Sequence, residues 1–456
     1  MTPEQLRALN VALVAFMRVF DVCVQYDPTA GHLHSYCRGL LSDLARKSVE
    51  PIALACGTAV RTLQEFLRDA VWDHFRVRDL LQGYLVRLSA LNAPDELGTI
   101  GVIDETSAAK KGTKTPGVSR QYCGERGKID NCVVTVHLGI ARGLFKAIVD
   151  AALFLPQAWN EDRERCRGAK IPDDLIYRPK WRIALEQVAR ATANGLKLEW
   201  LIFDEYYGGK PAFLHELDAQ GHRYIAEVPR NYRCLGRRPK GKKPKGGWRG
   251  KRVDNLTRYS PTWNRQPWCG VTLTRLTLED QLWEVRAGPV YLIRNRGNRR
   301  HRDMTDRTYW LIVARNAATR KTKYFLSNAS AGTPVEILLR VAFCRWNIEH
   351  SFRVCKSELG FTHFEGRSYI GMIRHQILCI LMMAFVAEHT DRLRGKNPEI
   401  TMEQVCRALN ERCRAWQNNR RHTSTIVYTA EVIEYHQKRN KAARDSRRKA
   451  RPSLRI

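Results

Sequence analysis

Two short apolar segments, each followed directly by an aspartate, constrain the fold of this chain more than any other feature. GTIGVIDET at 98–106 and LEWLIFDEYYGG at 198–209 place Asp104 and Asp204 after runs of strand-forming residues. Helical patterns lie before and after the second segment, and a further strand follows in HRYIAEVP. Alternating strands and helices predict an α/β fold that carries both aspartates at the ends of strands.

Other segments complete this α/β unit. A helical pattern at 180–194 is ended by Gly195, and a second helix is expected at about 210–219. CVVTVHLGIARGLFKAIVDAALFL, 132–155, predicts two strands joined at the turn Arg142-Gly143.

The first 92 residues show helical periodicity and almost no strand signal. SVEPIALACGTAVRTLQEFL at 48–67 has the outline of a helix-turn-helix, with Arg61, Gln64 and Arg68 on the face that could meet DNA. A plain helical hairpin explains this pattern equally well.

A basic, glycine-rich and proline-rich segment interrupts the α/β pattern. RCLGRRPKGKKPKGGWRGKR at 233–252 is too polar to fold alone and suits phosphate contact. A solvated linker is the alternative. Strand-like runs then continue to about 330, so residues 230–330 are expected to form a β-rich insertion. The DNA contacts expected in this segment are Lys240, Lys242, Lys243, Lys245 and Trp248.

The segment FCRWNIEHSFRVCKSELGF, 343–361, predicts a helix with charge on one face. Arg345, Glu349, Arg353 and Lys356 share that face, and an apolar stripe lies beside it. Glu349 would therefore lie at the rim of a buried face. A solvated helix with i,i+4 pairs is the simpler interpretation.

The charge of the chain points to a polyanionic partner. Among 456 residues, 77 Lys and Arg stand against 46 Asp and Glu, so the formal net charge is +31 and the pI is near 9.9. Nucleic acid is the leading candidate. A membrane is not expected, because no apolar run approaches about 18 residues and no signal segment begins the chain. The longest apolar run, ILCILMMAFVA at 377–387, has the length of a core helix.

The 13 cysteines are scattered without any C-x-x-C pair, which favours reduced thiols in a cytosol. His32, His34 and Cys37 could supply three zinc ligands, but no fourth ligand recurs at finger spacing. Packing and polar roles are the expected alternative.

Three acids from separate segments form a candidate catalytic set: Asp104, Asp204 and Glu349. Hard divalent cations such as Mg²⁺ prefer carboxylate oxygens and accept phosphate oxygens as further ligands. Two such ions can clamp the attacking and leaving oxygens of a phosphoryl displacement. Spacing alone does not separate this hypothesis from loop-capping by the two aspartates.

Three ordered blocks carry a family resemblance. VIDETSAAKKGTKTPGVSRQYCGERGKIDNC at 102–132 resembles the first-aspartate region of bacterial insertion-sequence transposases with an Asp-Asp-Glu site, specifically the insertion sequence 701 family. IFDEYYG at 202–208 resembles the second region, and RWNIEHSFRVCKSELGFTHFEGRSYIGMIRH at 345–375 the third. RGLLSDLARKS at 38–48 and QKRNKAARDS at 437–446 extend the resemblance over nearly the whole chain.

The resemblance implies an RNase H-like catalytic core interrupted by a β insertion. The expected domains are a helical DNA-binding domain at 1–97, the core at 98–229 and 331–435, the basic insertion at 230–330 and a basic tail at 436–456. It also implies two Mg²⁺ ions, for which Mn²⁺ can substitute, held by the three acids. The DNA contacts expected from the motif blocks are Lys110, Lys111, Arg120, Gln121, Tyr122, Arg345, Arg353 and Lys356.

One position departs from the related superfamily's signature, Tyr-x-x-Arg-x-x-x-Glu-x-x-x-x-x-x-Lys. Arg345, Glu349 and Lys356 fit its spacing, whereas Ala342 replaces the tyrosine. A phosphate contact or hairpin-forming role of that tyrosine is therefore in doubt here.

The expected function is DNA transposition. The enzyme would bind the terminal inverted repeats of its insertion sequence as a homodimer, cleave a strand there and transfer the 3′-OH into target DNA, in the cytoplasm with the nucleoid. The alternatives are a catalytically inactive, domesticated DNA-binding regulator and a simple nuclease with the same core.

Overall fold

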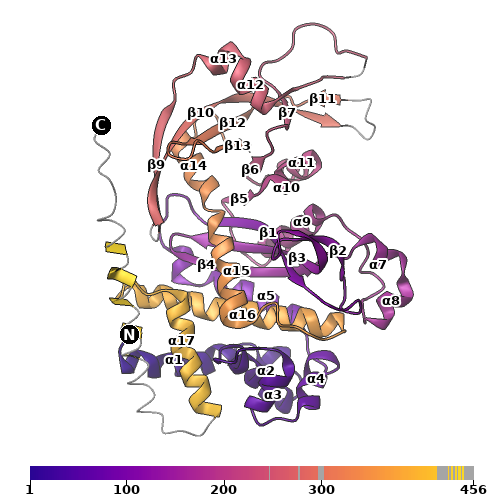
Figure 1. The fold of residues 1–456 in the computed structure, drawn as a ribbon, viewed down its shortest axis with the longest axis vertical. Helices are drawn as coiled ribbons and strands as arrows, with labels where there is room; N and C mark the ends of the chain where they lie inside the picture. Colours follow the sequence, from indigo (N-terminus) through magenta and orange to yellow (C-terminus); the bar gives the residue numbers. More distant parts are fainter. Residues whose placement is uncertain are drawn as a thin grey trace.

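The computed structural model describes residues 1–245, 247–275, 278–295, 302–417, 430, 433–434, 437–438, 440–442 and 444–445. A mixed sheet lies in the middle of the molecule, with N-terminal helices at one end and the insertion at the other (Figure 1). The predicted basic tail at 436–456 falls largely outside the described residues. The predicted domain boundaries stay predictions.

The N-terminal part is helical, as the periodicity predicts. Its elements are α1 (Pro3–Arg18), the 3₁₀ turn η1 (Asp21–Cys23), α2 (Asp27–Leu40), α3 (Val49–Ala55), α4 (Val60–Arg68), α5 (His74–Val86) and α6 (Ser89–Asn92). Gly57 turns the chain between α3 and α4 with a φ of +65°, a conformation that glycine adopts without steric cost. Leu63 and Leu67 of α4 are buried, while Arg61 and Arg68 are exposed.

The central strands follow one another in a mixed order. Their bounds are β1 (Ile100–Ala109), β2 (Ser119–Cys123), β3 (Lys128–Arg142), β4 (Phe145–Leu153), β5 (Trp200–Phe203) and β6 (Tyr224–Val228). β3 is antiparallel to both β1 and β4, whereas β1, β5 and β6 are parallel neighbours. The predicted hairpin is present, with Gly143 at its turn.

Helices connect these strands. They are α7 (Gln157–Glu161), α8 (Arg163–Gly168), α9 (Lys180–Ala193), α10 (Glu205–Gly208) and α11 (Pro211–Ala219). The predicted helices at 180–194 and 210–219 correspond to α9 and α11. The parallel β5 and β6 are thus joined by helical chain, as parallel neighbours require.

The insertion is rich in strands and continues the central sheet. Its elements are β7 (Arg233–Leu235), β8 (Lys251–Arg252), α12 (Val253–Tyr259), α13 (Pro261–Asn264), β9 (Cys269–Arg275), β10 (Leu278–Asn295), β11 (Arg302–Met304), β12 (Tyr309–Asn316) and β13 (Thr322–Ser327). β13 pairs antiparallel with β6. The sheet order is therefore β2-β3-β1-β5-β6-β13-β12-β10-β7-β8, with β4 beside β3 and with β9 and β11 beside β10.

Helices dominate after the insertion: α14 (Val335–Phe343), α15 (Trp346–Leu359), α16 (Tyr369–Arg394) and α17 (Met402–Gln417). α16 contains the apolar run at 377–387 and lies between the sheet and the N-terminal helices (Figure 1). It is long and apolar enough to cross a membrane, with a mean hydropathy of 1.8, but 94% of that window is buried inside the protein. Burial on all sides is typical of a core helix.

One hydrophobic core extends from the N-terminal helices through α16 into the sheet and the insertion. Arg374 of α16 strengthens this junction, because its guanidinium donates to the carbonyls of Phe66 and Leu67 in the last turn of α4 and of Trp72 after it. All 13 cysteines are thiols, as predicted, and most are buried.

Candidate active site

Asp104 and Asp204 lie side by side on parallel strands. Ile103 of β1 is in register with Phe203, the last residue of β5, so Asp104 in β1 lies beside Asp204, which directly follows β5. Asp204 caps α10 and accepts hydrogen bonds from the backbone N–H groups of Tyr206 and Tyr207. The prediction that Asp104 ends its strand is wrong. β1 continues to Ala109, because β3 still pairs with it from Asp104↔His137 to Ala109↔Cys132 after β5 has ended.

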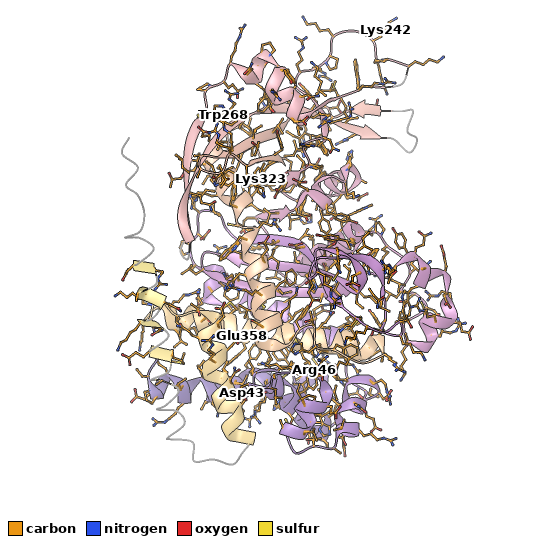
Figure 2. All side chains as sticks on the ribbon, in the orientation of Figure 1. Asp43, Arg46, Lys242, Trp268, Lys323 and Glu358 are labelled. Carbon is orange, nitrogen blue, oxygen red and sulfur yellow. The ribbon has the colours of Figure 1, made fainter. Side chains whose placement is uncertain are left out.

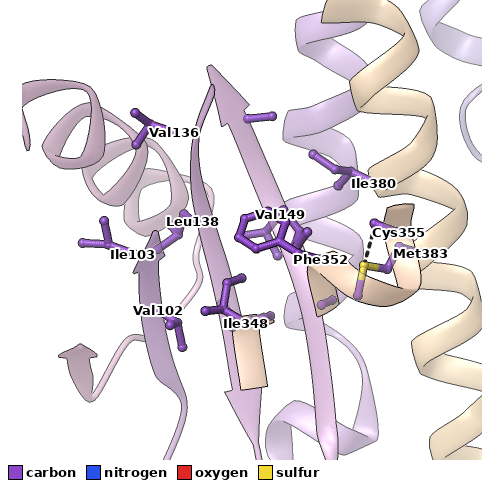
Figure 3. Packing of buried hydrophobic residues seen from close by; sticks show 14 of the residues in the cluster. Val102, Ile103, Val136, Leu138, Val149, Ile348, Phe352, Cys355, Ile380 and Met383 are labelled. Carbon is purple, nitrogen blue, oxygen red and sulfur yellow. Dashed lines mark hydrogen bonds between the residues drawn. The ribbon is translucent and has the colours of Figure 1, made fainter. Parts of the chain in front are cut away.

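Glu349 reaches this place from α15, which packs across the sheet. Ile348, Phe352, Cys355 and Leu359 form its buried stripe, as predicted. Figure 3 shows Ile348 and Phe352 among sheet residues, with Cys355 against Met383 of α16. Gly139 of β3 leaves room for this helix, because a Cβ there would lie 2.3 Å from Ile348 Cδ1.

The helix differs slightly from its prediction. α15 begins at Trp346 after Arg345, and Gly360 ends it with a φ of +68°. The preceding helix, α14, stops at Phe343, so Cys344 belongs to the break between the two helices.

Arg345 connects the acids from the two segments. Its Nη1 donates to Asp104 Oδ2 at 3.2 Å, and its Nη2 donates to Glu349 Oε1 at 2.5 Å. Within the described residues, no three acid, imidazole or thiol side chains form a ready-made metal site. The Arg345 guanidinium lies between Asp104 and Glu349, where it occupies the carboxylates that would have to meet to bind an ion. The same result applies to His32, His34 and Cys37, and His34 pairs with Asp21 instead.

Burial and neighbouring charge set the electrostatics of the aspartates. Burial, followed by the proximity of Asp204, raises the pKa of Asp104 to about 7, although Arg345 opposes the rise. Burial also raises the pKa of Asp204. Burial alone would lower the pKa of Arg345, but the surrounding carboxylates raise it. Two adjacent buried carboxylates of this kind favour a bound cation.

The three acids line a groove with a volume of about 770 Å³. Asp104, Asp204 and Glu349 contribute to its wall, together with Lys356 of α15. The atoms that the three acids offer as metal ligands are carboxylate oxygens, which suit a hard divalent cation rather than zinc. A groove with acids and a lysine on its wall can hold a phosphate beside such a cation.

A second cavity, of about 280 Å³, lies on the insertion side of Arg345 and Glu349. Glu227 of β6 lies in its wall and accepts a hydrogen bond from Lys323 of β13 at 2.6 Å. In Figure 2, Lys323 is labelled on the insertion near the core. The backbone of Glu227 packs closely on Gly208. A Cβ at position 208 would lie 1.9 Å from the Glu227 carbonyl oxygen, so only glycine fits there.

The predicted DNA-binding residues near the groove fall into two groups. Lys356 lines the groove, and burial lowers its pKa. Tyr122 also lines it and is 62% exposed. Lys110 is instead occupied inside the protein, where it donates to the carbonyls of Thr362 and Phe364 at 3.2 and 2.7 Å. Arg353 also lines the groove, but it pairs with Glu403 of α17.

The remaining predicted DNA contacts lie elsewhere. Lys111 after β1 and Arg120 in β2 are exposed, and Gln121 donates to the Cys132 carbonyl. Arg61, Gln64 and Arg68 are exposed on α4. The predicted insertion lysines Lys240, Lys242, Lys243 and Lys245 are exposed, and Trp248 is half-buried. Figure 2 labels Lys242 at the outer end of the insertion, far from α15.

Sequence reasoning missed several groups next to the acids. Glu105 accepts a hydrogen bond from Lys180 of α9 at 2.6 Å, and both side chains are largely buried. Glu227 and Glu403 were missed as well. An available signal for Glu105 was the Asp-Glu pair that occurs at both aspartates, in VIDET and IFDEY.

Comparison with known proteins decides the family. A model of the DDE superfamily endonucleases matches residues 23–289, which is more than half of the chain. The chain belongs to the DDE superfamily endonucleases. The matched range contains Asp104 and Asp204 and ends before Glu349.

A curated relative agrees with this family. This DDE superfamily endonuclease is 32% identical over 197 residues to the probable transposase for insertion sequence element IS701 of Microchaete diplosiphon. The aligned part covers 42% of this chain and 47% of that relative, so it spans about half of the relative's length. The resemblance to the insertion sequence 701 family is thereby confirmed.

Two solved structures were also found for this DDE superfamily endonuclease. A piggyBac transposase synaptic complex with hairpin DNA is 9% identical, with a TM-score of 0.39, over 88% of this chain and 75% of that one. The NurA nuclease from Sulfolobus solfataricus is 11% identical, with a TM-score of 0.23, over 63% of this chain and 93% of that one. Both TM-scores are too low to carry an argument about this chain.

Proposed function

We propose that this chain is a DNA transposase that binds the terminal inverted repeats of its insertion sequence, cleaves a strand there and transfers the 3′-OH into target DNA. One observation carries the proposal: Asp104, Asp204 and Glu349, from three distant segments, line the same groove. Family membership and the net charge of +31 support DNA as the substrate.

The strand order supports an RNase H-like core. β4-β3-β1-β5-β6 has an antiparallel β3 next to three parallel strands, which is the order expected of that core. Asp104 then stands on the first strand of this core in chain order, and Asp204 directly follows the fourth, where β1 and β5 are adjacent. The insertion enters between the second aspartate and Glu349.

Two Mg²⁺ ions fit the acids of the groove, and Mn²⁺ can replace them. Asp104, Asp204 and Glu349 would hold these ions through their carboxylate oxygens. The raised pKa of Asp104 and the oxygen-only donor set of the three acids support this assignment. When bound, the ions supply charge stabilisation to the attacking and leaving oxygens of an in-line phosphoryl displacement.

The protein's own side chains would position the DNA. Lys356, on the wall of the groove, would hold a phosphate beside the acids. Arg345 would leave Asp104 and Glu349 when cations bind there and could then grip a phosphate with its planar fork. Water and then the 3′-OH are the nucleophiles, so no covalent enzyme intermediate is needed.

DNA is proposed as the partner along the rest of the chain. The helical N-terminal part, with Arg61, Gln64 and Arg68 of α4, would bind the inverted repeat, and the insertion lysines would contact phosphates. A homodimer would bring two ends together, and the protein would act in the bacterial cytoplasm with the nucleoid.

Cleavage of an end-bearing duplex tests the proposal. The inverted repeat is taken from the DNA that flanks the gene, and the labelled duplex is incubated with the chain in Mg²⁺ or in EDTA. We expect strand cleavage at the repeat boundary in Mg²⁺ alone. A scrambled end is the matched control, and equal cleavage of it would favour a simple nuclease instead. Specific binding without cleavage would favour a catalytically inactive regulator.

A further inference from the structure

α17 holds the turn of α15 that carries Glu349. Glu403 Oε1 lies 3.1 Å from His350 Nε2 and accepts a hydrogen bond from Arg353 Nη2 at 3.0 Å. His350 directly follows Glu349 in the chain, and Arg353 lies one helical turn beyond it. A single carboxylate therefore grips α15 at two places around Glu349.

Glu403 is itself well fixed. Thr401 and Gln404 form a reciprocal cap at the start of α17, with N-to-side-chain oxygen distances of 3.1 and 3.3 Å. Val405 and Cys406, which follow, are fully buried. Burial would raise the pKa of Glu403, but the hydrogen bond from His350 and the charge of Arg353 outweigh it and lower the pKa to about 2. The Glu403 carboxylate is thus charged at neutral pH.

The side chain of Glu349, in contrast, is fixed by few contacts. Its side chain is 48% exposed, and its ion pair is with Arg345. The apolar stripe of α15 sets how closely the helix approaches the sheet, but apolar contacts are not directional. Arg353 stands four residues after Glu349, where i,i+4 pairing would compete with a cation in the groove. Arg353 lines the same groove as Glu349, but its guanidinium is held by Glu403 at 3.0 Å.

We propose that Glu403 is a positioning residue for Glu349: it fixes the rotation of α15 through His350 and Arg353 and keeps Arg353 from pairing with Glu349. The inference rests on the proposed function only in giving Glu349 a role in metal binding. Groups that orient a metal ligand without touching the metal typically change metal affinity or activity about 10-fold to 100-fold when removed.

Metal binding without DNA is the first test. Mn²⁺ affinity of the full chain is measured by calorimetry for the wild type, Glu403→Ala, Glu403→Gln and Glu186→Ala. We expect Glu403→Ala to weaken Mn²⁺ binding about tenfold, Glu403→Gln to weaken it less because an acceptor remains, and Glu186→Ala to leave it unchanged. Glu186 is the matched control, because it pairs with Arg178 beside α9 and is similarly half-buried.

The double variant Glu403→Ala with Arg353→Ala separates positioning from stability. If freed Arg353 captures Glu349, removing it should restore part of the Mn²⁺ affinity, whereas a merely structural role predicts a further loss. Wild-type Mn²⁺ affinity in Glu403→Ala, or a lower melting temperature with unchanged affinity, would overturn the inference.

Single-turnover cleavage completes the design. Glu403→Ala should slow cleavage by about the same factor as it weakens Mn²⁺ binding, with the affinity for the DNA end unchanged. A loss of end affinity at a normal cleavage rate would contradict positioning. If the wild type binds Mn²⁺ but does not cleave, the proposed function fails, while the Mn²⁺ comparison still decides the role of Glu403.

Discussion

Arg345 donates a hydrogen bond to Asp104 at 3.2 Å, although 241 residues separate the two in the chain. The same guanidinium holds Glu349. Arg345, which we expect to hold a phosphate during the reaction, thus places its positive charge between two proposed metal ligands when no metal is bound. A divalent cation and Arg345 would compete for the same carboxylates.

Arg345→Gln should therefore tighten Mn²⁺ binding several-fold in the absence of DNA, because a competing cation is removed. The same variant, and Arg345→Lys, should slow strand cleavage at least tenfold, since both lose the planar fork that grips phosphate through two bonds. Calorimetry and single-turnover cleavage measure the two effects. Weaker metal binding in Arg345→Gln would mean that Arg345 supports the acids instead of competing for them.

Asp104→Asn, Asp204→Asn and Glu349→Gln should each abolish cleavage and leave binding to the DNA end largely intact. Each change removes a proposed metal ligand at nearly constant shape. Cleavage and gel-shift assays on the same preparations measure both properties. Near-normal Mg²⁺-dependent cleavage by one variant would remove that residue from the catalytic set.

Lys356→Ala should reduce cleavage about tenfold or more with little change in melting temperature, because Lys356 lines the groove beside the acids. Lys110→Ala is the contrasting variant. Its ammonium binds the carbonyls of Thr362 and Phe364, so its loss should lower the melting temperature. A normal cleavage rate in Lys356→Ala would contradict a role for Lys356 in catalysis and would favour a solvated surface helix.

The insertion lysines should contribute to the salt dependence of binding. If the complex neutralises about eight phosphates, log affinity should fall against log salt with a slope of about −7. Replacing Lys240, Lys242, Lys243 and Lys245 by serine should flatten the slope without changing which end is preferred, because phosphate contacts carry no sequence information. A solvated loop predicts no change in either quantity. A lost preference at an unchanged slope would contradict the assignment.

Metal binding should depend on pH near neutrality. The pKa of Asp104 is raised to about 7, so the folded protein keeps a proton there that the unfolded chain releases at lower pH. Ionisation of Asp104 therefore costs folding stability as pH rises toward 7, and a cation must displace its proton. Mn²⁺ affinity should be about tenfold weaker at pH 6 than at pH 8. Equal affinity at the two values would contradict a proton-linked Asp104.

Much of the local structure follows from the sequence alone. The apolar run before Asp204 produces β5, the stripe through Ile348 and Phe352 produces the buried face of α15, and Gly360 ends that helix. These features depend on residues within a few turns of one another, which hydrophobic periodicity and glycine conformations report directly. The three blocks predicted that Asp104, Asp204 and Glu349 belong together, and all three line one groove; their catalytic role stays a prediction.

Contacts between distant segments were decided by the tertiary structure. β1 continues past Asp104 because β3 pairs with it, and the insertion joins the core sheet because β13 pairs with β6. Lys110 and Lys356 look alike in sequence, yet one is tied to backbone carbonyls and the other lines the groove. Periodicity tells which face of an element is buried, but not which element covers it. That choice depends on how all the faces pack together, and it is what brought Arg345 to Asp104 and Glu403 to His350.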